Sequence, residues 1–301
     1  MQLLVFIVAY PILFVISRLP FPLLYALSDS VAYLLYRGIK YRLKVVRNNI
    51  QLAFPNKDET EVESIVEAFY THMSDVFLEM IKSMGMDEKA MRKRFGVKNI
   101  ELLTQFYGQK RGAIIMCGHY SSWEWMMSLG YHMEAPGYGI YTPLQNRYFD
   151  RLVRRIRKKH NAFLISRYEV KRELTEHFEQ QIYGVYGFAS DQSPRPRPKT
   201  YWRTFLGVPV PVFTGAEDLA KQNNLGIVFA DIQRIKRGYY QVDFRLLTDD
   251  AAATHPREIT DTFTQWLEEQ IYKDPTQYLW SHNRFKYRHK APQDLLKASN
   301  S

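Results

Sequence analysis

A histidine and a glutamate close together in sequence, His119 and Glu124, form the pair best suited to chemistry. They lie in the segment Cys117-Gly-His-Tyr-Ser-Ser-Trp-Glu-Trp125, directly after a short apolar run. A glutamate in the first turns of a following helix can fold back onto the imidazole, accept the proton of one ring nitrogen and fix the tautomer. The other ring nitrogen can then take a proton from a hydroxyl. This is the base half of a catalytic triad, with the substrate's own hydroxyl in place of the serine.

Other interpretations of the same residues stay open. His-x4-Glu is short enough to arise by chance, so His119 could be only a hydrogen-bonded group in a capped turn. Cys117 could carry an acyl group as a nucleophile, although its place on a buried strand equally fits core packing. A metal site is disfavoured, because HExxH is absent, the other histidines are scattered and the chain has one cysteine. We predict no metal and no cofactor.

Two basic tracts could bind phosphates. Residues 147–160 (RYFDRLVRRIRKKH) hold seven Arg or Lys, including Arg154 and Arg157, with apolar residues between them. Residues 195–203 follow Asp191-Gln192, and their prolines predict a loop over the site. Such cations can bind the phosphates of a lipid head group or of a phosphopantetheine arm. A solvated basic helix face is the alternative.

Short apolar runs alternate with helical stretches from residue 111 onward, which predicts the elements that position these residues. The predicted strands are 113–118, 139–142, 162–166, 185–191, 226–235 and 239–247. The predicted helices are 57–84, 121–133, 147–159, 170–181, 213–222 and 258–272. This order is typical of an α/β fold with a mainly parallel sheet flanked by helices and an antiparallel pair at its end. The strands that lead to His119 and Asp191 should end at the same edge of the sheet.

The N-terminal sequence predicts a membrane anchor. Residues 1–17 carry no charged side chain, and the chain stays largely apolar to residue 36, with three prolines interrupting it. A basic cluster follows at once, which by the positive-inside rule keeps the rest of the chain in the cytoplasm. Two ordinary buried helices are the alternative.

The predicted domain organisation follows from these segments. Residues 1–36 form the hydrophobic membrane anchor, 37–110 a basic linker and amphipathic helical region, 111–290 the α/β core and 291–301 a polar tail. The apolar stripe of helix 57–84, which includes Met80 and Ile81, is interpreted as core. The net charge of +10 predicts an anionic partner, while the 15% aromatic content indicates a packed fold.

Taken in order, several segments resemble the late lipid A biosynthesis acyltransferases, the lauroyl/myristoyl family within the lysophospholipid acyltransferase superfamily. The matching segments are Arg47-Asn-Asn-Ile50, Phe54-Pro55, Gly118-His119 through Glu124, Tyr141-Thr-Pro143 with Asn146, Asp150 and Arg157, Asp191-Gln192, Phe205-Leu206-Gly207, Thr214-Gly215, Leu219-Ala220 and 277–286. They cover nearly the whole chain in the family's order. One departure is the segment Ser193-Pro-Arg-Pro-Arg-Pro198, where the family has a glycine-containing loop.

The resemblance implies a glycerolipid acyltransferase-like fold and acyl transfer from an acyl carrier protein to a hydroxyl of a lipid A precursor. His119 would be the general base and Glu124 its partner. Arg157 and Asp191 fall on an arginine and an aspartate important to the family's site, and we expect both to bind substrate together with Arg154 and Tyr141. The implied location is the cytoplasmic face of the cell inner membrane.

Two rival functions remain at this stage. Related branches of the superfamily acylate aminolipids, lysophospholipids or glycosylated phospholipids. A membrane-tethered protein that only binds anionic lipids would also explain the charge. Nucleic acid is not expected as a partner, because the aromatic residues among the cations form no RNP-like motif.

Overall fold

The computed structural model describes residues 1–160 and 162–298. Within them, seven strands form one sheet in the order β1-β9-β8-β2-β5-β3-β4. These strands are β1 (Phe95–Lys98), β2 (Ala113–Cys117), β3 (Gly137–Tyr141), β4 (Ala162–Ser166), β5 (Val185–Ala189), β8 (Gly226–Lys236) and β9 (Tyr239–Thr248). Neighbouring strands run parallel except β8 and β9, which are antiparallel. The predicted α/β class, with a mainly parallel sheet and a closing antiparallel pair, is confirmed.

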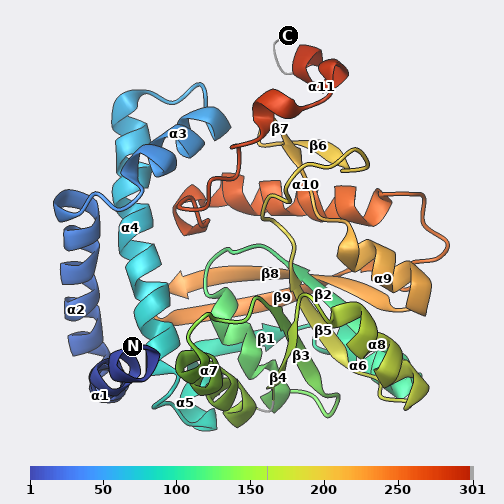
Figure 1. The fold of residues 1–301 in the computed structure, drawn as a ribbon, viewed down its shortest axis with the longest axis horizontal. Coiled ribbons are helices and arrows are strands. Elements are labelled where there is room, and N and C mark those ends of the chain that lie inside the picture. Colours follow the sequence, from blue (N-terminus) through green and yellow to red (C-terminus); the bar gives the residue numbers. More distant parts are fainter. Residues whose placement is uncertain (161, 299–301) are drawn as a thin grey trace.

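Helices surround this sheet and a small hairpin lies outside it (Figure 1). The α-helices after the N-terminal region are α3 (Leu43–Ala53), α4 (Glu59–Lys82), α5 (Glu88–Arg94), α6 (Glu101–Gly108), α7 (Arg147–Lys159), α8 (Val170–Glu179), α9 (Gly215–Asn223), α10 (Glu258–Lys273) and α11 (Gln293–Ala298). The 3-10 helices are η2 (Trp123–Tyr131), η3 (Pro275–Gln277) and η4 (Arg288–Lys290), and the hairpin is β6 (Trp202–Phe205) with β7 (Val208–Pro211).

The central strand β2 is buried on both faces, as its unbroken apolar sequence requires. Because side chains alternate along a strand, Ile114 and Met116 enter one core while Ile115 and Cys117 enter the other. The first core lies under α4, α9 and α10, and the second under α5, α6 and η2. In Figure 1, α10 lies on one side of the strands and α5 and α7 on the other.

Two helices precede this core, α1 (Gln2–Arg18) and α2 (Phe21–Tyr33), followed by a π-helical turn, η1 (Leu34–Gly38). Helix α1 does not fit the alternative prediction of a buried helix, because it keeps an exposed apolar stripe that includes Leu4 and Val8, whereas α2 buries Leu24, Ser28 and Ala32. Among the described residues, no helix combines the length and hydropathy needed to cross a membrane. The prediction that residues 1–36 anchor the chain in a membrane stays a prediction.

The helix α4 joins the N-terminal helices to the sheet, and it lies beside α2 in Figure 1. A capping box at Asp58 and Glu61 starts it by satisfying backbone N–H groups at its first turn. Two buried or half-buried hydrogen bonds then hold α2 against it, from Ser28 Oγ to Asp75 at 2.6 Å and from Tyr25 OH to Glu79 at 2.8 Å. The N-terminal helices are therefore docked on the domain by specific polar contacts.

Several elements differ from the sequence prediction. The segment predicted as helix 121–133 is a 3-10 helix over Trp123–Tyr131, and it begins after Ser121 takes a left-handed φ of 54°. Strand β1 and the β6–β7 hairpin were not predicted, because each strand is only four residues long and gives little periodic signal. Residues 299–301 of the predicted polar tail lie outside the described residues. The other boundaries of the predicted domains stay predictions.

Candidate active site

His119 and Asp191 meet at the carboxyl ends of two adjacent parallel strands. His119 follows β2 and Asp191 follows β5, and the register pairs Cys117 with Ala189 at the ends of these strands. His119 Nδ1 lies 2.6 Å from Asp191 Oδ1, and the backbone N–H of His119 donates to Asp191 Oδ2 at 3.1 Å. Both carboxylate oxygens are therefore bound by one residue, which fixes the imidazole relative to the carboxylate. The prediction that these two strand ends share one sheet edge is confirmed.

The contacts of the His119 imidazole indicate which ring nitrogen carries the proton. Because Asp191 accepts at Nδ1, that nitrogen carries the proton of the neutral ring. His119 Nε2 faces Gln192 Nε2 at 3.3 Å, a contact in which the amide donates and the ring nitrogen accepts. The side chain of His119 is 19% exposed, whereas that of Asp191 is 2% exposed. Nε2 therefore carries the lone pair of the neutral ring and accepts from Gln192, so an acceptor hydroxyl would have to take the place of that amide.

Charges around the pair favour a basic imidazole. Burial by itself lowers the pKa of His119, but the negative charges of Asp191 and Glu124, with the Asp191 hydrogen bond, outweigh it and raise that pKa above 6.5. Burial raises the pKa of Asp191, yet the neighbouring charges of His119 and Arg284 hold it well below its usual range. Asp191 is therefore a carboxylate in the working pH range, able to stabilise an imidazolium.

Glu124 contacts Arg157, which corrects the contact predicted from the sequence. Its Oε2 accepts from Arg157 Nη2 at 2.7 Å, and both side chains are largely shielded from solvent. The left-handed turn at Ser121 redirects the chain before η2 begins, so that Glu124 faces α7. The prediction that Glu124 accepts the ring proton of His119 was wrong, because the adjacent strand places Asp191 at that nitrogen. Glu124 stays near enough to act on the imidazole through its charge.

Tyr141 and Arg154 gather around Asp150. Tyr141 OH donates to Asp150 at 3.1 Å and Arg154 Nε donates to it at 3.0 Å, with the guanidinium over the tyrosine ring. Among the contacts of the described residues, none joins Tyr141 or Arg154 directly to His119. Asp150 also accepts from the backbone of Leu144, which ties this cluster to the edge of a neighbouring cavity.

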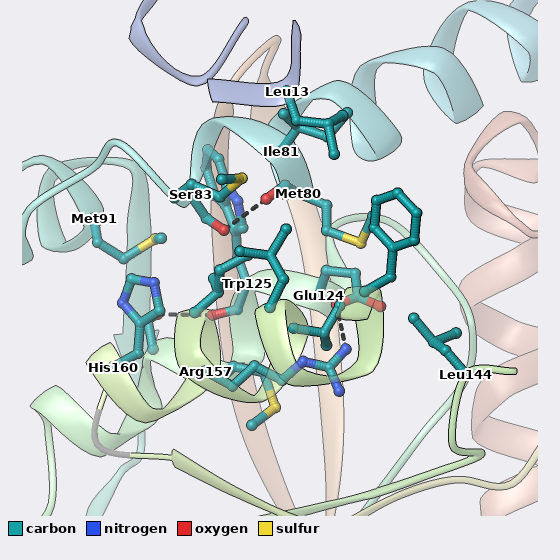
Figure 2. A pocket seen from close by; sticks show the side chains of 17 residues that line it. Leu13, Met80, Ile81, Ser83, Met91, Glu124, Trp125, Leu144, Arg157 and His160 are labelled. Atoms are coloured by element: carbon teal, nitrogen blue, oxygen red, sulfur yellow. Dashed lines mark hydrogen bonds and ion pairs between the residues drawn. The ribbon is translucent and has the colours of Figure 1, made fainter. Parts of the chain in front are cut away.

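That cavity has a volume of about 260 Å³ and an almost entirely apolar wall. Figure 2 shows Glu124 and Arg157 joined on its wall, with Leu13, Met80 and Ile81 across from them. Its lining residues are Leu13, Met80, Ile81, Ser83, Met84, Met91, Glu124, Trp125, Met127, Ser128, Leu144, Phe149, Leu152, Val153, Ile156, Arg157 and His160. Methionines adapt to flexible apolar ligands, so a cavity with four of them suits an alkyl chain.

Four helices far apart in the sequence, α1, α4, η2 and α7, build most of this cavity. Helix α1 contributes Leu13 to its wall and packs Phe6 against Phe149 of α7, with ring centroids 5.3 Å apart. The indole N–H of Trp125 donates to the backbone oxygen of Glu79, which fixes η2 on α4. Met80 and Ile81 of α4, interpreted as core from the sequence, line the cavity instead. The alternating apolar and basic residues of 147–159 were the available signal for the α7 wall.

Two further residues of the site lay within segments that resemble the family, but the sequence analysis assigned them no role. Gln192 follows Asp191 and reaches Nε2 of His119. Arg284, in the C-terminal segment, is buried behind Asp191 and donates to Ser193 and to the backbone oxygen of Pro211. Neither gives a signal in a single sequence, because an isolated Gln or Arg in a loop is usually solvated.

A histidine paired with a buried carboxylate, beside a cavity with an apolar wall, is an arrangement that suits an enzyme which activates an acceptor hydroxyl for acyl transfer. Residues 2–287 match the model of the bacterial lipid A biosynthesis acyltransferase family, and the chain belongs to that family.

Several curated relatives are named as lipid A biosynthesis acyltransferases, and this chain aligns with most of the length of each. A lipid A biosynthesis lauroyltransferase of Escherichia coli (strain K12) is 24% identical, with 92% of this chain and 90% of the relative aligned. A lipid A biosynthesis acyltransferase of Haemophilus influenzae is 26% identical, with 90% and 86% aligned. A lipid A biosynthesis palmitoleoyltransferase of E. coli (strain K12) is 23% identical, with 90% and 87% aligned. The predicted family is thus confirmed, and the protein is an acyltransferase of lipid A biosynthesis.

Proposed function

We propose that this acyltransferase moves a fatty acyl group from an acyl carrier protein thioester to a hydroxyl of a lipid A precursor. The observation that carries the proposal is the His119–Asp191 pair, together with an apolar cavity whose wall includes Glu124 and Arg157. Two of the relatives are named for the acyl groups lauroyl and palmitoleoyl, which are long alkyl chains.

His119 acts in this proposal as general base. Its Nε2 takes the proton of the acceptor hydroxyl, and the acceptor oxygen attacks the thioester carbonyl carbon. A new C–O bond forms and the C–S bond breaks, and the leaving thiolate takes the proton back from the imidazolium. Asp191 holds the tautomer throughout and stabilises the charged ring. No covalent acyl-enzyme is needed, and burial raises the pKa of the Cys117 thiol to about 12, which disfavours the thiolate nucleophile.

Arg157 is the proposed donor to the thioester carbonyl. The backbone N–H groups of His119 and Ser121 are already bound to Asp191 and to Gln277, so they cannot serve an oxyanion without rearrangement. Arg157 has further N–H groups beyond the one bound to Glu124, and it lines the cavity. A guanidinium so held can stabilise negative charge on the carbonyl oxygen. Glu124 would position Arg157 and reinforce the basicity of His119.

The outer face of α7 is the proposed binding surface for anionic partners. Arg147, Arg151, Arg154 and Arg155 lie on this helix, while its apolar residues face the cavity. Arg154 is 48% exposed, whereas Arg157 is 16% exposed. We therefore assign acceptor phosphates and the acidic carrier protein to the exposed cations, with Tyr141 orienting Arg154 through Asp150.

Membrane attachment is proposed through α1 at the cytoplasmic face of the inner membrane. Leu4, Val8, Ile12 and Val15 form one exposed stripe along this helix. A helix with such a stripe can lie in the plane of the membrane interface. Since α1 also contributes Leu13 to the cavity wall, an acyl acceptor held in the bilayer would reach the site beside this helix.

Filling the cavity tests its role as the acyl slot. Ile156→Trp places an indole in the space of the alkyl chain. We expect transfer from long-chain thioesters to fall by about fourfold per methylene left outside, because each buried methylene contributes about 0.8 kcal/mol. Transfer from a short-chain thioester should be much less affected. Rates with a series of acyl carrier protein thioesters measure the effect. Ile156→Leu, which keeps the volume, is the matched control, and an equal loss for all chain lengths would contradict the assignment.

A charged residue introduced on the exposed stripe of α1 tests whether this helix contacts the membrane. Val8→Glu should reduce flotation with phosphatidylglycerol-containing vesicles about tenfold, because it removes a valine worth about 1.5–3 kcal/mol when buried. Tyr168→Glu introduces the same charge at another exposed hydrophobic position and should leave flotation unchanged. Unaltered flotation of Val8→Glu would show that α1 does not contact the bilayer.

The function itself is tested by incubating the detergent-solubilised protein with acyl carrier protein thioesters and a panel of lipid acceptors. Mass spectrometry should find a lipid A precursor that has gained one acyl chain. If product forms only on an aminolipid, a lysophospholipid or a glycosylated phospholipid, the proposed acceptor is wrong but the acyl-transfer mechanism is retained. No product on any acceptor from a folded protein, together with salt-sensitive lipid binding, would replace the proposal by the membrane-tethered binding function.

A further inference from the structure

A buried arginine, Arg284, lies behind the carboxylate of Asp191. It is 2% exposed and comes from the C-terminal segment that runs beside the His119 turn, where Leu279 N–H donates to His119 O at 3.1 Å. Asp191 and Arg284 line one small internal cavity. Arg284 Nη1 donates to Ser193 Oγ at 2.8 Å and to Pro211 O at 2.9 Å. Both acceptors are neutral, and among the described residues Asp191 is the carboxylate whose negative charge acts on Arg284.

The other groups around the pair do not supply this balancing charge. Glu124 of η2 is paired with Arg157 of α7, so these two largely cancel. His282, which accepts from Ser193 N–H, has its pKa lowered by burial to about 4 and is neutral. Burial keeps Tyr278 and Cys117 neutral as well, by raising the pKa of each. Lys286, on the same C-terminal segment, is exposed and acts on His282.

We propose that Arg284 is a positioning residue that supplies the counter-charge of Asp191 and so keeps the Asp191–His119 pair free of an extra proton at neutral pH. This inference rests on the proposed role of His119 as base. With Arg284 present, the ionised Asp191 and the neutral His119 form part of a buried set with no net charge. Without it, the same set carries one uncompensated negative charge in a poorly solvated place, and binding a proton removes that charge. A base that already holds its proton cannot accept one from the substrate.

The test compares charge removal with charge retention at this position. Arg284→Met should move the apparent pKa of the acid limb of kcat/KM up by about one to two pH units. Activity at neutral pH should therefore fall by about tenfold or more and recover as the pH is raised. Arg284→Lys keeps the charge and should keep the midpoint close to that of the unmodified protein. Ser193→Ala removes a hydrogen-bond partner of Arg284 without removing its charge, and its midpoint should also stay unchanged.

A titration of the His119 ring, followed by NMR of histidine-labelled protein, measures the same pKa without any substrate. A raised His119 pKa in Arg284→Met, in a protein that shows no acyl transfer, would support the counter-charge and reject only the proposed function. Equal pKa values in Arg284→Met and the unmodified protein, or equal shifts in the Met and Lys variants, would overturn the counter-charge role.

Folding of the variants gives a second route if Arg284→Met alone does not fold. The double variant Asp191→Asn/Arg284→Met removes both charges, so it should recover the folded state, as thermal unfolding would show. If the double variant is also unfolded, the site needs the hydrogen bonds and packing of Arg284 and the counter-charge role is rejected.

Discussion

His119→Ala should lower the rate of acyl transfer by about 10²–10⁴-fold, because the reaction loses its general base. The fold should survive, since His119 lies at the end of β2 on the open side of the site and is 19% exposed. Single-turnover acyl transfer to the lipid acceptor, followed by mass spectrometry, measures the loss. Thermal unfolding should give a midpoint close to that of the unmodified protein.

His282→Ala is the matched control for this experiment. His282 is near the same site, but burial lowers its pKa to about 4, which makes it a much weaker base than His119. It therefore cannot replace His119 as base, and its loss should cost less than about tenfold. An active His119→Ala enzyme, or equal losses in the two variants, would reject the mechanism.

Asp191→Asn should lower kcat by about 10³–10⁴-fold, the scale seen when the carboxylate of a serine-protease triad is changed to an amide. The backbone N–H of His119 needs an acceptor at Oδ2, so the new amide would direct its oxygen there and its NH₂ toward Nδ1 of the ring. The ring proton would then move to Nε2. That nitrogen could no longer take a proton from the acceptor, and the kinetics of purified variants would show the loss.

The NMR resonance of the Nδ1 proton of His119 shows whether Asp191 or Glu124 accepts that proton. A proton shared between His119 and a buried carboxylate should give a strongly downfield signal in the unmodified protein. Asp191→Asn should abolish this signal. Glu124→Gln should keep it, even though it lowers activity through Arg157, because Glu124 binds the guanidinium and leaves Nδ1 untouched. The opposite pattern would restore Glu124 as the direct partner of His119.

The contrast between Asp191 and Glu124 shows where single-sequence reasoning fails. Both carboxylates were recognised, and the strand ends that carry His119 and Asp191 were placed at one edge of the sheet. Their roles could not be assigned from spacing, because proximity in sequence favoured Glu124. The parallel pairing of β2 and β5 brings Asp191 closer across a distance of 72 residues.

The cavity shows a second limit of the same kind. Met80 and Ile81 of α4 share an ordinary apolar stripe with core residues, and the stripe itself does not reveal which members face an empty space. That depends on how α1, α4, η2 and α7 pack together. The seven cations of 147–159 predicted an anion-binding helix, while its apolar residues became a cavity wall.

The sequence by itself determined the α/β class, most strands and helices, and the family, and it singled out His119 as the proposed base. Period and composition are local properties, and an ordered set of motifs along the chain identifies relatives. Only the tertiary structure decided which carboxylate binds Nδ1 of His119, which residue holds Arg157, and which buried cation shares a small cavity with Asp191. Those contacts depend on the strand order, which brings together segments from distant parts of the chain. Electrostatic interactions depend on the distance between charges in space, and the spacing of residues in the sequence does not give that distance.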